Sequence, residues 1–282
     1  MLRFLLPLAL CAAAFLIPSI ATAGAPETVI STEGTTTRPA AATPQTTKEP
    51  RTGHRFPDSV LATMKKVEGD AANTTENTTG RDSVQKAKPP VLDLIGLACR
   101  DKTILSVKVY SYVLYVDRHW ASKELAEFRG LKLSELKKQK KLYELLLQQN
   151  AIKELRLRFA RTVDAKDAVK AFEKSLTSRI LERKAKEKGT REEKLAELER
   201  FQSFFKVKKL KKGDELRFTW HPDGTLCTVV NGKRHPDMLA PHLAASLFDV
   251  YLGEKPISKS GKNKLLRRLP DVLNANVKVS SR

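Results

Sequence analysis

The sequence predicts an α+β fold, in which a large antiparallel sheet carries helices packed on one side. Three observations support this fold class: a long run of β-branched and aromatic residues, a later hairpin signal, and amphipathic helices that do not alternate strictly with strands. Strict alternation would indicate a parallel α/β sheet instead. We expect one domain over residues 91–282, because the two segments before it differ in composition.

The first 23 residues are typical of a secretory signal peptide. A basic start at Arg3 is followed by an apolar stretch over 4–17 and by an Ala-x-Ala arrangement at Ala21 and Ala23. The apolar stretch is shorter than the ~20 residues that a membrane-spanning helix needs. We therefore expect residues 1–23 to direct the protein into the secretory pathway, to an extracellular or lumenal location, or to the periplasm in a bacterium.

Residues 24–90 are rich in Thr, Pro, Ala and Gly and hold few aliphatic residues that could be buried. We expect this segment to be disordered, because it does not offset the entropy of ordering its backbone. Its Asn-x-Thr sites at Asn73 and Asn77 are either N-glycosylation acceptors or chance matches in a Thr-rich tract. A plastid reached through the endoplasmic reticulum is an alternative destination, although eight acidic residues argue against a transit peptide.

The clearest strand covers residues 107–117, an uninterrupted run of β-branched and aromatic side chains. Side chains along a strand alternate between its two faces. Lys108, Tyr110 and Tyr112 are therefore expected on one face and Ser111 on the other.

Helical patterns and a second strand follow. Residues 122–128 and 134–149 have helical patterns, and Ser134 is the expected N-cap of the second helix. Residues 151–163 alternate apolar and charged side chains, which is typical of a half-buried strand.

Two further helices are marked by their N-terminal signals. Asp164 is expected to cap a helix that continues to Ile180 through apolar residues three and four positions apart. Thr190 and Glu193 have the spacing of a capping box and predict the start of the next helix.

The last predicted elements are a hairpin and a closing helix. Residues 216–220 and 226–230 flank a Pro-Asp-Gly turn and therefore predict two antiparallel strands. A helix over 238–252 is expected to end at Gly253 in the left-handed conformation that glycine favours.

Basic residues outnumber acidic ones by 52 to 32, which gives a net charge of +20 and suggests an anionic partner. Nucleic acid is not the expected partner, because aromatic residues do not interleave with the basic clusters as base stacking requires. The predicted secretory route also separates the protein from most nucleic acid. Weak, salt-sensitive adsorption to an acidic membrane surface is an alternative use of the charge.

Several other classes of site have no motif in this sequence. It contains no Gly-x-Ser-x-Gly elbow, no glycine-rich phosphate loop and no close His or Cys spacing of the kind that binds metals. We therefore expect no metal and no cofactor. Cys99 and Cys227 could pair in an oxidising compartment, but the sequence leaves their separation open.

Two segments resemble one known superfamily. Gly96-Leu-Ala-Cys-Arg100, followed by the strand over 108–117, is similar to the first core strands of the chalcone isomerase superfamily. Leu247-Phe-Asp-Val-Tyr-Leu-Gly-Glu-Lys-Pro-Ile-Ser258 is similar to the end of the late helix in its plant members, including the fatty-acid-binding branch. The resemblance spans residues 91–269 and implies the chalcone isomerase-like fold, with a cleft between sheet and helices.

The resemblance also implies a set of site positions. The isomerases of the superfamily close a ring in a chalcone with an arginine, a threonine, a tyrosine, an asparagine and a late Ser or Thr. Here the arginine falls on Arg100, the threonine position holds Tyr110, the late position lies near Val250, and the segment over 162–172 has neither tyrosine nor asparagine. Because one missing donor costs about 2.7–4 kcal/mol of transition-state stabilisation, efficient isomerisation is not expected.

Arg100 with Tyr110 instead resembles the carboxylate clamp of the fatty-acid-binding branch. This implies a non-catalytic protein, expected to be a monomer, that binds a fatty acid or similar hydrophobic carboxylate in the cleft. Lys108 and Val250 are further candidate ligand-binding residues. An active chalcone isomerase-type intramolecular lyase with a rearranged site is the alternative function, and a surface arginine and a core tyrosine are the plainer alternatives for the two clamp residues.

Overall fold

The computed structural model describes residues 44–66, 88–102, 107–182 and 189–275, all within one compact unit over Thr43–Arg282. Its centre is an eight-stranded antiparallel sheet. The strands are β3 (Ser59–Leu61), β4 (Val91–Lys102), β5 (Val107–Asp117), β6 (Lys153–Phe159), β9 (Glu215–Trp220), β10 (Thr225–Val230), β11 (Lys233–Arg234) and β12 (Met238–Leu239). Their order is β11-β10-β9-β6-β5-β4-β3, and β12 pairs with β10.

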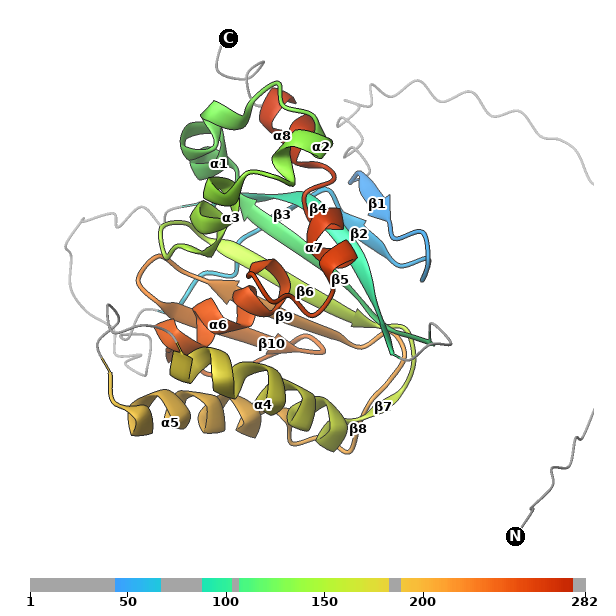
Figure 1. Cartoon of the computed structure of the whole chain (residues 1–282). Helices are drawn as coiled ribbons and strands as arrows, with labels where there is room; N and C mark the ends of the chain where they lie inside the picture. Colours follow the sequence, from blue (N-terminus) through green and yellow to red (C-terminus); the bar gives the residue numbers. More distant parts are fainter. Residues whose placement is uncertain (1–43, 67–87, 103–106, 183–188, 276–282) are drawn as a thin grey trace, which may run out of the picture. The chain divides into compact units, whose positions relative to one another are not determined.

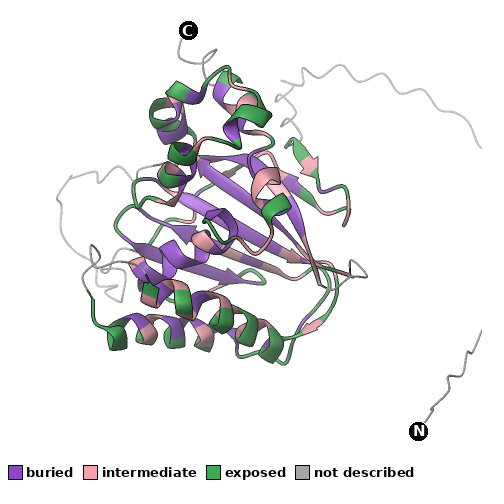
Figure 2. Cartoon of the chain, in the orientation of Figure 1, coloured by how far each residue is buried: buried purple, intermediate pink, exposed green. Residues whose placement is uncertain are grey.

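Helices cover one face of this sheet, which confirms the predicted fold class (Figure 1). They are α1 (Arg118–Glu124), α2 (Leu133–Leu136), α3 (Lys140–Leu147), α4 (Ala165–Glu182), α5 (Arg191–Gln202), α6 (Pro241–Leu252), α7 (Lys259–Lys264) and α8 (Leu269–Ala275). Two small strand pairs accompany the sheet, β1 (Thr46–Lys48) with β2 (Arg55–Pro57) and β7 (Val163–Asp164) with β8 (Lys209–Leu210). Most residues of the long central strands and of α6 are buried (Figure 2).

Several predicted elements are confirmed. β5 has the predicted bounds, β9 and β10 form the predicted hairpin, and α4 begins directly after Asp164. The capping box is present as well, because the backbone N–H of Glu193 donates to Thr190 Oγ1 at 3.1 Å and the N–H of Thr190 donates to the Glu193 carboxylate at 2.7 Å. Local sequence patterns thus determined these elements correctly.

The helix predicted over 134–149 is two helices, α2 and α3. Lys132 stands at the N-cap position of α2, so Ser134 is not the cap and lies inside the helix. The break between the helices has a packing reason. Leu136 and Leu142 are both fully buried, yet residues six apart in one continuous helix point about 120° apart, so a break between the helices lets both side chains reach the core.

The closing helix starts later than predicted and ends differently. Met238 belongs to β12, and α6 begins at Pro241. Gly253 has φ −66°, so the predicted left-handed stop is wrong. A Cβ atom at Gly253 would collide with the Asp249 carboxylate, so any other residue there would force that side chain to shift.

The prediction that residues 24–90 are disordered is wrong for residues 44–66. These residues form β1, β2 and β3, and β3 extends the main sheet by pairing with β4. Phe56 is fully buried and packs in a second apolar cluster on the face of the sheet away from the helices. The domain therefore begins before residue 91, and this N-terminal strap, as we call residues 44–66, is part of it.

Polar groups fix the strap to the sheet. Ser111 Oγ lies 2.9 Å from His54 Nδ1 and 2.6 Å from Thr52 Oγ1, and Thr52 Oγ1 donates to Glu49 at 2.8 Å. Because the strap covers this face, β6 is buried on both sides rather than half-buried as predicted. The strap is thus an ordered layer of the domain, although the composition of residues 44–66 is typical of a disordered segment.

Some predictions concern residues outside the described ranges. The signal peptide over 1–23 and the candidate glycosylation sites Asn73 and Asn77 lie there. Within the described ranges, none of the helices has the length and apolar character that a membrane span requires. Cys99 and Cys227 are free and buried, and they lie on β4 and β10, which three strands separate, too far for a disulfide bond.

Candidate functional site

Arg100 and Tyr110 are direct neighbours across β4 and β5, as their register shows. Both side chains are partly exposed. Arg100 Nη1 donates to the backbone carbonyl of Ile257 at 3.1 Å, in the loop between α6 and α7. The structure therefore brings together the two residues of the predicted clamp and places the α6–α7 loop beside them.

Two more tyrosines complete this group. The hydroxyl of Tyr110 lies 3.2 Å from that of Tyr251, which is buried on α6. The ring of Tyr251 in turn lies 4.8 Å from the ring of Tyr112, two residues along β5. We call Arg100, Tyr110, Tyr112 and Tyr251 the Arg–Tyr cluster.

Burial raises the pKa of each tyrosine in the Arg–Tyr cluster, and the charge of Arg100 opposes that shift. The tyrosines are therefore neutral hydrogen-bond donors at ordinary pH and not phenolates. When two hydroxyls share one hydrogen bond, one proton of the pair stays free for a third partner. The Tyr110–Tyr251 pair thus keeps a donor available next to a guanidinium group.

The α6–α7 loop and the start of α7 pack tightly on this cluster. Ser258 caps α7 by accepting the N–H of Gly261 at 3.0 Å. A Cβ atom at Gly261 would collide with the hydroxyl of Tyr112, so this close approach requires glycine. The N–H of Ile257 also donates to the carbonyl of Val250 at 2.8 Å, which anchors the loop to the end of α6.

The structure places the other two candidate residues elsewhere. A β-bulge at Val109 breaks the alternation of β5, so Lys108 does not follow Tyr110 on the helix-covered face. Its ammonium group donates to the carbonyl of Arg51 in the strap instead. The side chain of Val250 is buried in the main core cluster. Neither contact brings these side chains to Arg100, and a ligand-binding role for them stays a prediction.

Tyr112 and Tyr251 were not among the site residues predicted from the sequence. Signals for both were present: Tyr112 shares the predicted face of Tyr110, and Tyr251 follows Val250 within the late-helix motif. Their meeting depends on how α6 packs on β5, which is a tertiary contact that local patterns do not encode. Tertiary packing therefore adds two tyrosines to the site that the sequence predicts.

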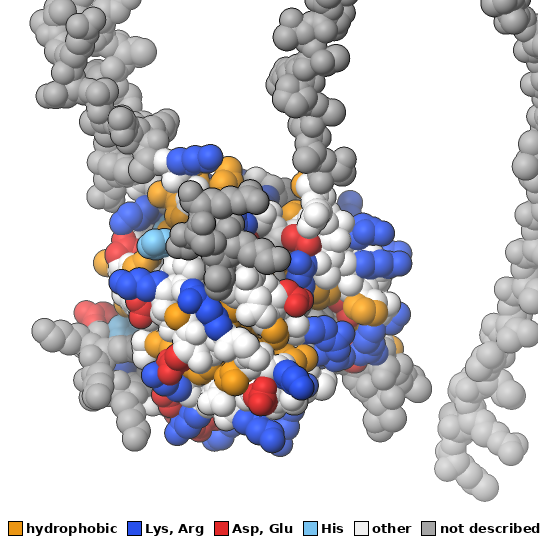
Figure 3. All heavy atoms as spheres, turned by 90° about the horizontal axis from the view of Figure 1, so that it is seen from above, with side chains coloured by type: hydrophobic (Ala, Val, Ile, Leu, Met, Phe, Trp, Pro, Cys, Tyr) orange, Lys and Arg blue, Asp and Glu red, His pale blue; other side chains and the backbone are white. Residues whose placement is uncertain are grey.

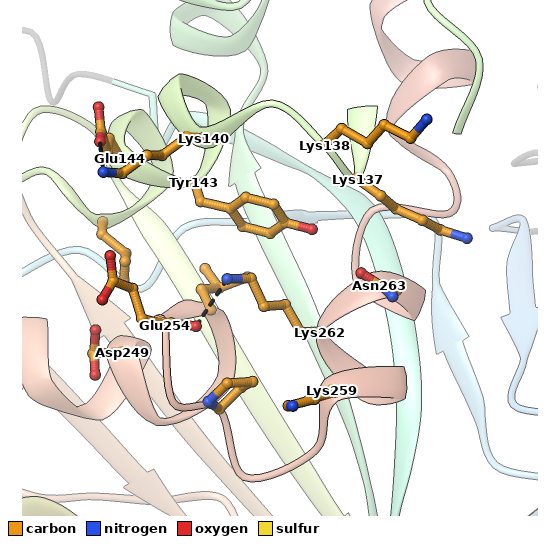
Figure 4. A pocket seen from close by; sticks show the side chains of 14 residues that line it. Lys137, Lys138, Lys140, Tyr143, Glu144, Asp249, Glu254, Lys259, Lys262 and Asn263 are labelled. Atoms are coloured by element: carbon orange, nitrogen blue, oxygen red, sulfur yellow. Dashed lines mark hydrogen bonds and ion pairs between the residues drawn. The ribbon is translucent and has the colours of Figure 1, made fainter. Parts of the chain in front are cut away.

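An open pocket of about 540 Å³ lies beside the α6–α7 loop (Figure 4). Residues from the turn after α2, from α3, from the end of α6 and from α7 line it, and its lining includes neither Arg100 nor Tyr110. In the part of the chain that the structure describes, His, Cys, Asp and Glu side chains form no group suited to a metal ion.

Comparisons with known proteins place this architecture. Residues 130–267 match the family model described as chalcone isomerase-like. Fatty-acid-binding protein 1 of Arabidopsis thaliana is 24% identical over 224 residues, which cover 77% of this chain and 68% of that protein.

A crystal structure of a fatty-acid-binding protein from Arabidopsis thaliana has the same fold, with a TM-score of 0.60 at 21% identity. The match covers 82% of this chain and 100% of that one. The resemblance inferred from Arg100, the strand after it and the late-helix motif is therefore confirmed. Residues 130–267 are similar to the chalcone isomerase-like family, and the chain has the fold of this solved structure.

Proposed function

We propose that the domain binds a fatty acid or a similar hydrophobic carboxylate without chemically converting it. The observation that carries this proposal is the position of Arg100 beside a tyrosine pair that keeps one donor free. Proteins named for fatty-acid binding are among the similar ones, in sequence and in structure, which supports the same ligand class.

The head group of such a ligand suits the Arg–Tyr cluster. A guanidinium group has five N–H donors, and the structure pairs one nitrogen of Arg100 with the Ile257 carbonyl. A carboxylate accepts two parallel hydrogen bonds from arginine and a third from a neighbouring hydroxyl. Each hydrogen bond to a charged group of this kind contributes about 1.5–3 kcal/mol.

The acyl tail would lie against the apolar, helix-covered face of the sheet. Tyr110 packs edge-on against Phe159 at a ring distance of 5.9 Å; Phe159 belongs to the main core cluster, and the partly buried Tyr110 packs against it. We infer that the ligand carboxylate replaces the Ile257 carbonyl as the acceptor of Arg100. The α6–α7 loop would then move when the ligand enters, because it holds that carbonyl in place.

The alternative of an isomerase finds less support. The segment over 162–172 lacks the tyrosine and asparagine that the resemblance implies for catalysis. The tyrosines of the Arg–Tyr cluster have raised pKa values, so they suit hydrogen-bond donation to a bound anion better than proton abstraction.

A titration of the delipidated protein with a long-chain fatty acid tests the proposal. Arg100→Gln should weaken binding roughly 10- to 100-fold, because it removes the charged partner and keeps a similar volume. Tyr110→Phe should weaken it less, since Tyr251 still offers a hydroxyl. Arg161→Gln is the matched control, because Arg161 is exposed and carries the same charge.

Equal affinity in wild type, Arg100→Gln and Arg161→Gln would refute the assignment of the head-group site. Circular dichroism of each variant shows whether the fold is retained. A chalcone absorbance assay runs in parallel: loss of chalcone at the buffer rate agrees with the proposal, and clear acceleration by the wild type would favour the isomerase.

A further inference from the structure

The open pocket beside the α6–α7 loop is a second basic site, distinct from the Arg–Tyr cluster. Lys137 and Lys138 after α2 and Lys259 on α7 line it, and none of these three ammonium groups has an ion pair among the described residues. The acidic residues nearby are largely engaged, since Glu144 lies 3.9 Å from Lys140.

A second acidic residue of the pocket is engaged in the same way. Asp249 accepts a hydrogen bond from Arg179 at 2.9 Å. Glu254 is the one remaining carboxylate in the lining. The lining therefore has a surplus of positive charge that other described side chains do not neutralise.

Lysines alone do not define a site on this protein. On the face seen in Figure 3, Lys and Arg side chains are spread among small separate patches of apolar side chains. A specific site requires a feature that distinguishes this pocket from the surrounding basic surface.

Tyr143 supplies that feature. It is 8% exposed, and its hydroxyl is buried with no hydrogen-bond partner among the described residues. Figure 4 shows its ring extending from α3 into the middle of the pocket, between the lysines of α7 and those that follow α2. Most buried hydroxyls have a partner, so an unpaired one that points into a basic pocket indicates a ligand.

Lys262 completes the arrangement. Its ammonium group lies 4.0 Å from the centroid of the Tyr143 ring and donates to the Gly253 carbonyl at 2.8 Å. Burial lowers the pKa of Lys262, a shift that a bound anion would reverse. Lys137, Lys138, Lys259 and Lys262 thus line the pocket together with Tyr143 and come from three elements, with Lys137 and Lys138 at its edge, pointing away from Tyr143 in Figure 4.

We propose that this pocket binds a phosphate group, either on a soluble organic phosphate or on the head group of an acidic lipid. A phosphate carries up to two charges and presents three oxygens to donors from different directions, whereas a carboxylate presents two in one plane. Lysine binds phosphate as a point charge, which suits side chains that come from separate elements. A volume of about 540 Å³ also leaves room for the organic part of the ligand.

Tyr143→Phe is the sharpest test, because it removes only the unpaired hydroxyl. Isothermal titration with inorganic phosphate and with glycerol 3-phosphate, and flotation with phosphatidic acid vesicles, would compare this variant with the wild type. We expect roughly tenfold weaker binding in Tyr143→Phe and at least as large a loss in Lys137→Gln/Lys259→Gln. The thermal midpoint of Tyr143→Phe should stay unchanged or rise, because an unpaired buried group is lost.

Lys166→Gln/Lys170→Gln is the control, since both lysines are exposed on α4 and the change in net charge is the same. It should bind within about twofold of the wild type. Binding of the soluble phosphates assigns a free organic phosphate, and binding of vesicles alone assigns a lipid head group; either supports the site. The proposal is overturned if no probe binds, or if Tyr143→Phe and the control bind as the wild type does.

Discussion

The two faces of the central sheet use their polar residues differently, and neighbouring residues on β5 show the contrast. Ser111 faces the strap, where its hydroxyl is bonded to both His54 and Thr52. Tyr110 faces the helices, where it shares one hydrogen bond with Tyr251 and lies beside the partly exposed Arg100. The hydroxyl of Ser111 is thus satisfied on the strap-covered face, whereas the Tyr110–Tyr251 pair keeps one donor free on the helix-covered face.

β6 repeats the contrast with charged residues. Glu154 faces the strap, accepts hydrogen bonds from Arg156 at 2.5 Å and from Thr219 at 2.7 Å, and is fully buried. Lys153 faces the helices and is also fully buried. Its ammonium group donates to the Gln148 carbonyl and lies 4.6 Å from the centroid of the Trp220 ring, but no carboxylate pairs with it among the described residues. The strap-covered face thus pairs its buried charges with each other, whereas the buried cation of the helix-covered face has no acidic partner among the described residues.

The largest effect on stability is expected at the buried Glu154. Glu154→Ala removes the partner of Arg156 and leaves a buried guanidinium unpaired, which costs about 3–5 kcal/mol of unfolding free energy. Urea denaturation measures the loss. Glu173→Ala on the exposed side of α4 should stay within about 0.5 kcal/mol of the wild type. Similar losses for the two variants would show that the strap-covered network does not stabilise the fold.

The strap itself gives the next largest effect. Phe56→Ala should cost about 3 kcal/mol, because it removes a fully buried ring that packs between strap and sheet. Leu61→Ala in the same strap should cost much less, since Leu61 is 55% exposed. Chemical denaturation together with limited proteolysis of residues 44–66 would check both. If Phe56→Ala is as stable as the wild type, residues 44–66 do not stabilise the domain, and the prediction of a disordered segment would hold for them too.

A smaller effect of opposite sign is expected at Lys153. Burial lowers the pKa of Lys153 to about 7, from 10.5 in an exposed lysine. Between these values the unfolded chain binds a proton that the folded protein does not, so wild-type stability falls as the pH is lowered from 10.5 to 7. Lys153→Met removes this slope. It should stabilise the protein by about 1–2 kcal/mol at pH 7 and by little at pH 10.5.

Thermal or urea unfolding of the wild type and Lys153→Met at several pH values measures that difference. A gain that is the same at every pH would mean that the Lys153 side chain is costly for its shape rather than for its charge. A loss of stability at pH 7 would contradict the contrast between the faces, because it would show that the buried amine is paired.

Local signals predicted much of the fold. Alternation identified β5 and the β9–β10 hairpin, and capping chemistry located the start of α5. The order of the strap could not be predicted, because its few apolar residues, among them Phe56 and Val60, lie within a Thr- and Pro-rich segment. Its order comes from pairing with β4 and from the hydrogen bonds of Ser111, both of which are long-range contacts.

Some residues of the candidate site could be predicted from the sequence, and others could not. Arg100 and Tyr110 could be named from the sequence because a motif carries them, and their register brings them together. Lys108 was misplaced because a single-residue bulge reverses the face that alternation assigns. Tyr251 and Tyr143 become site residues only through the packing of α6 and α3, which no local pattern reports.

The proposed function requires Arg100 to bind the charged head of a hydrophobic ligand. The most direct measurement compares the affinities of a fatty acid and of the alcohol of equal chain length, in wild type and in Arg100→Gln. The wild type should prefer the acid by at least tenfold, and Arg100→Gln should bind both ligands as the wild type binds the alcohol. If Arg100→Gln keeps the full preference for the acid, another residue binds the carboxylate and the account is wrong.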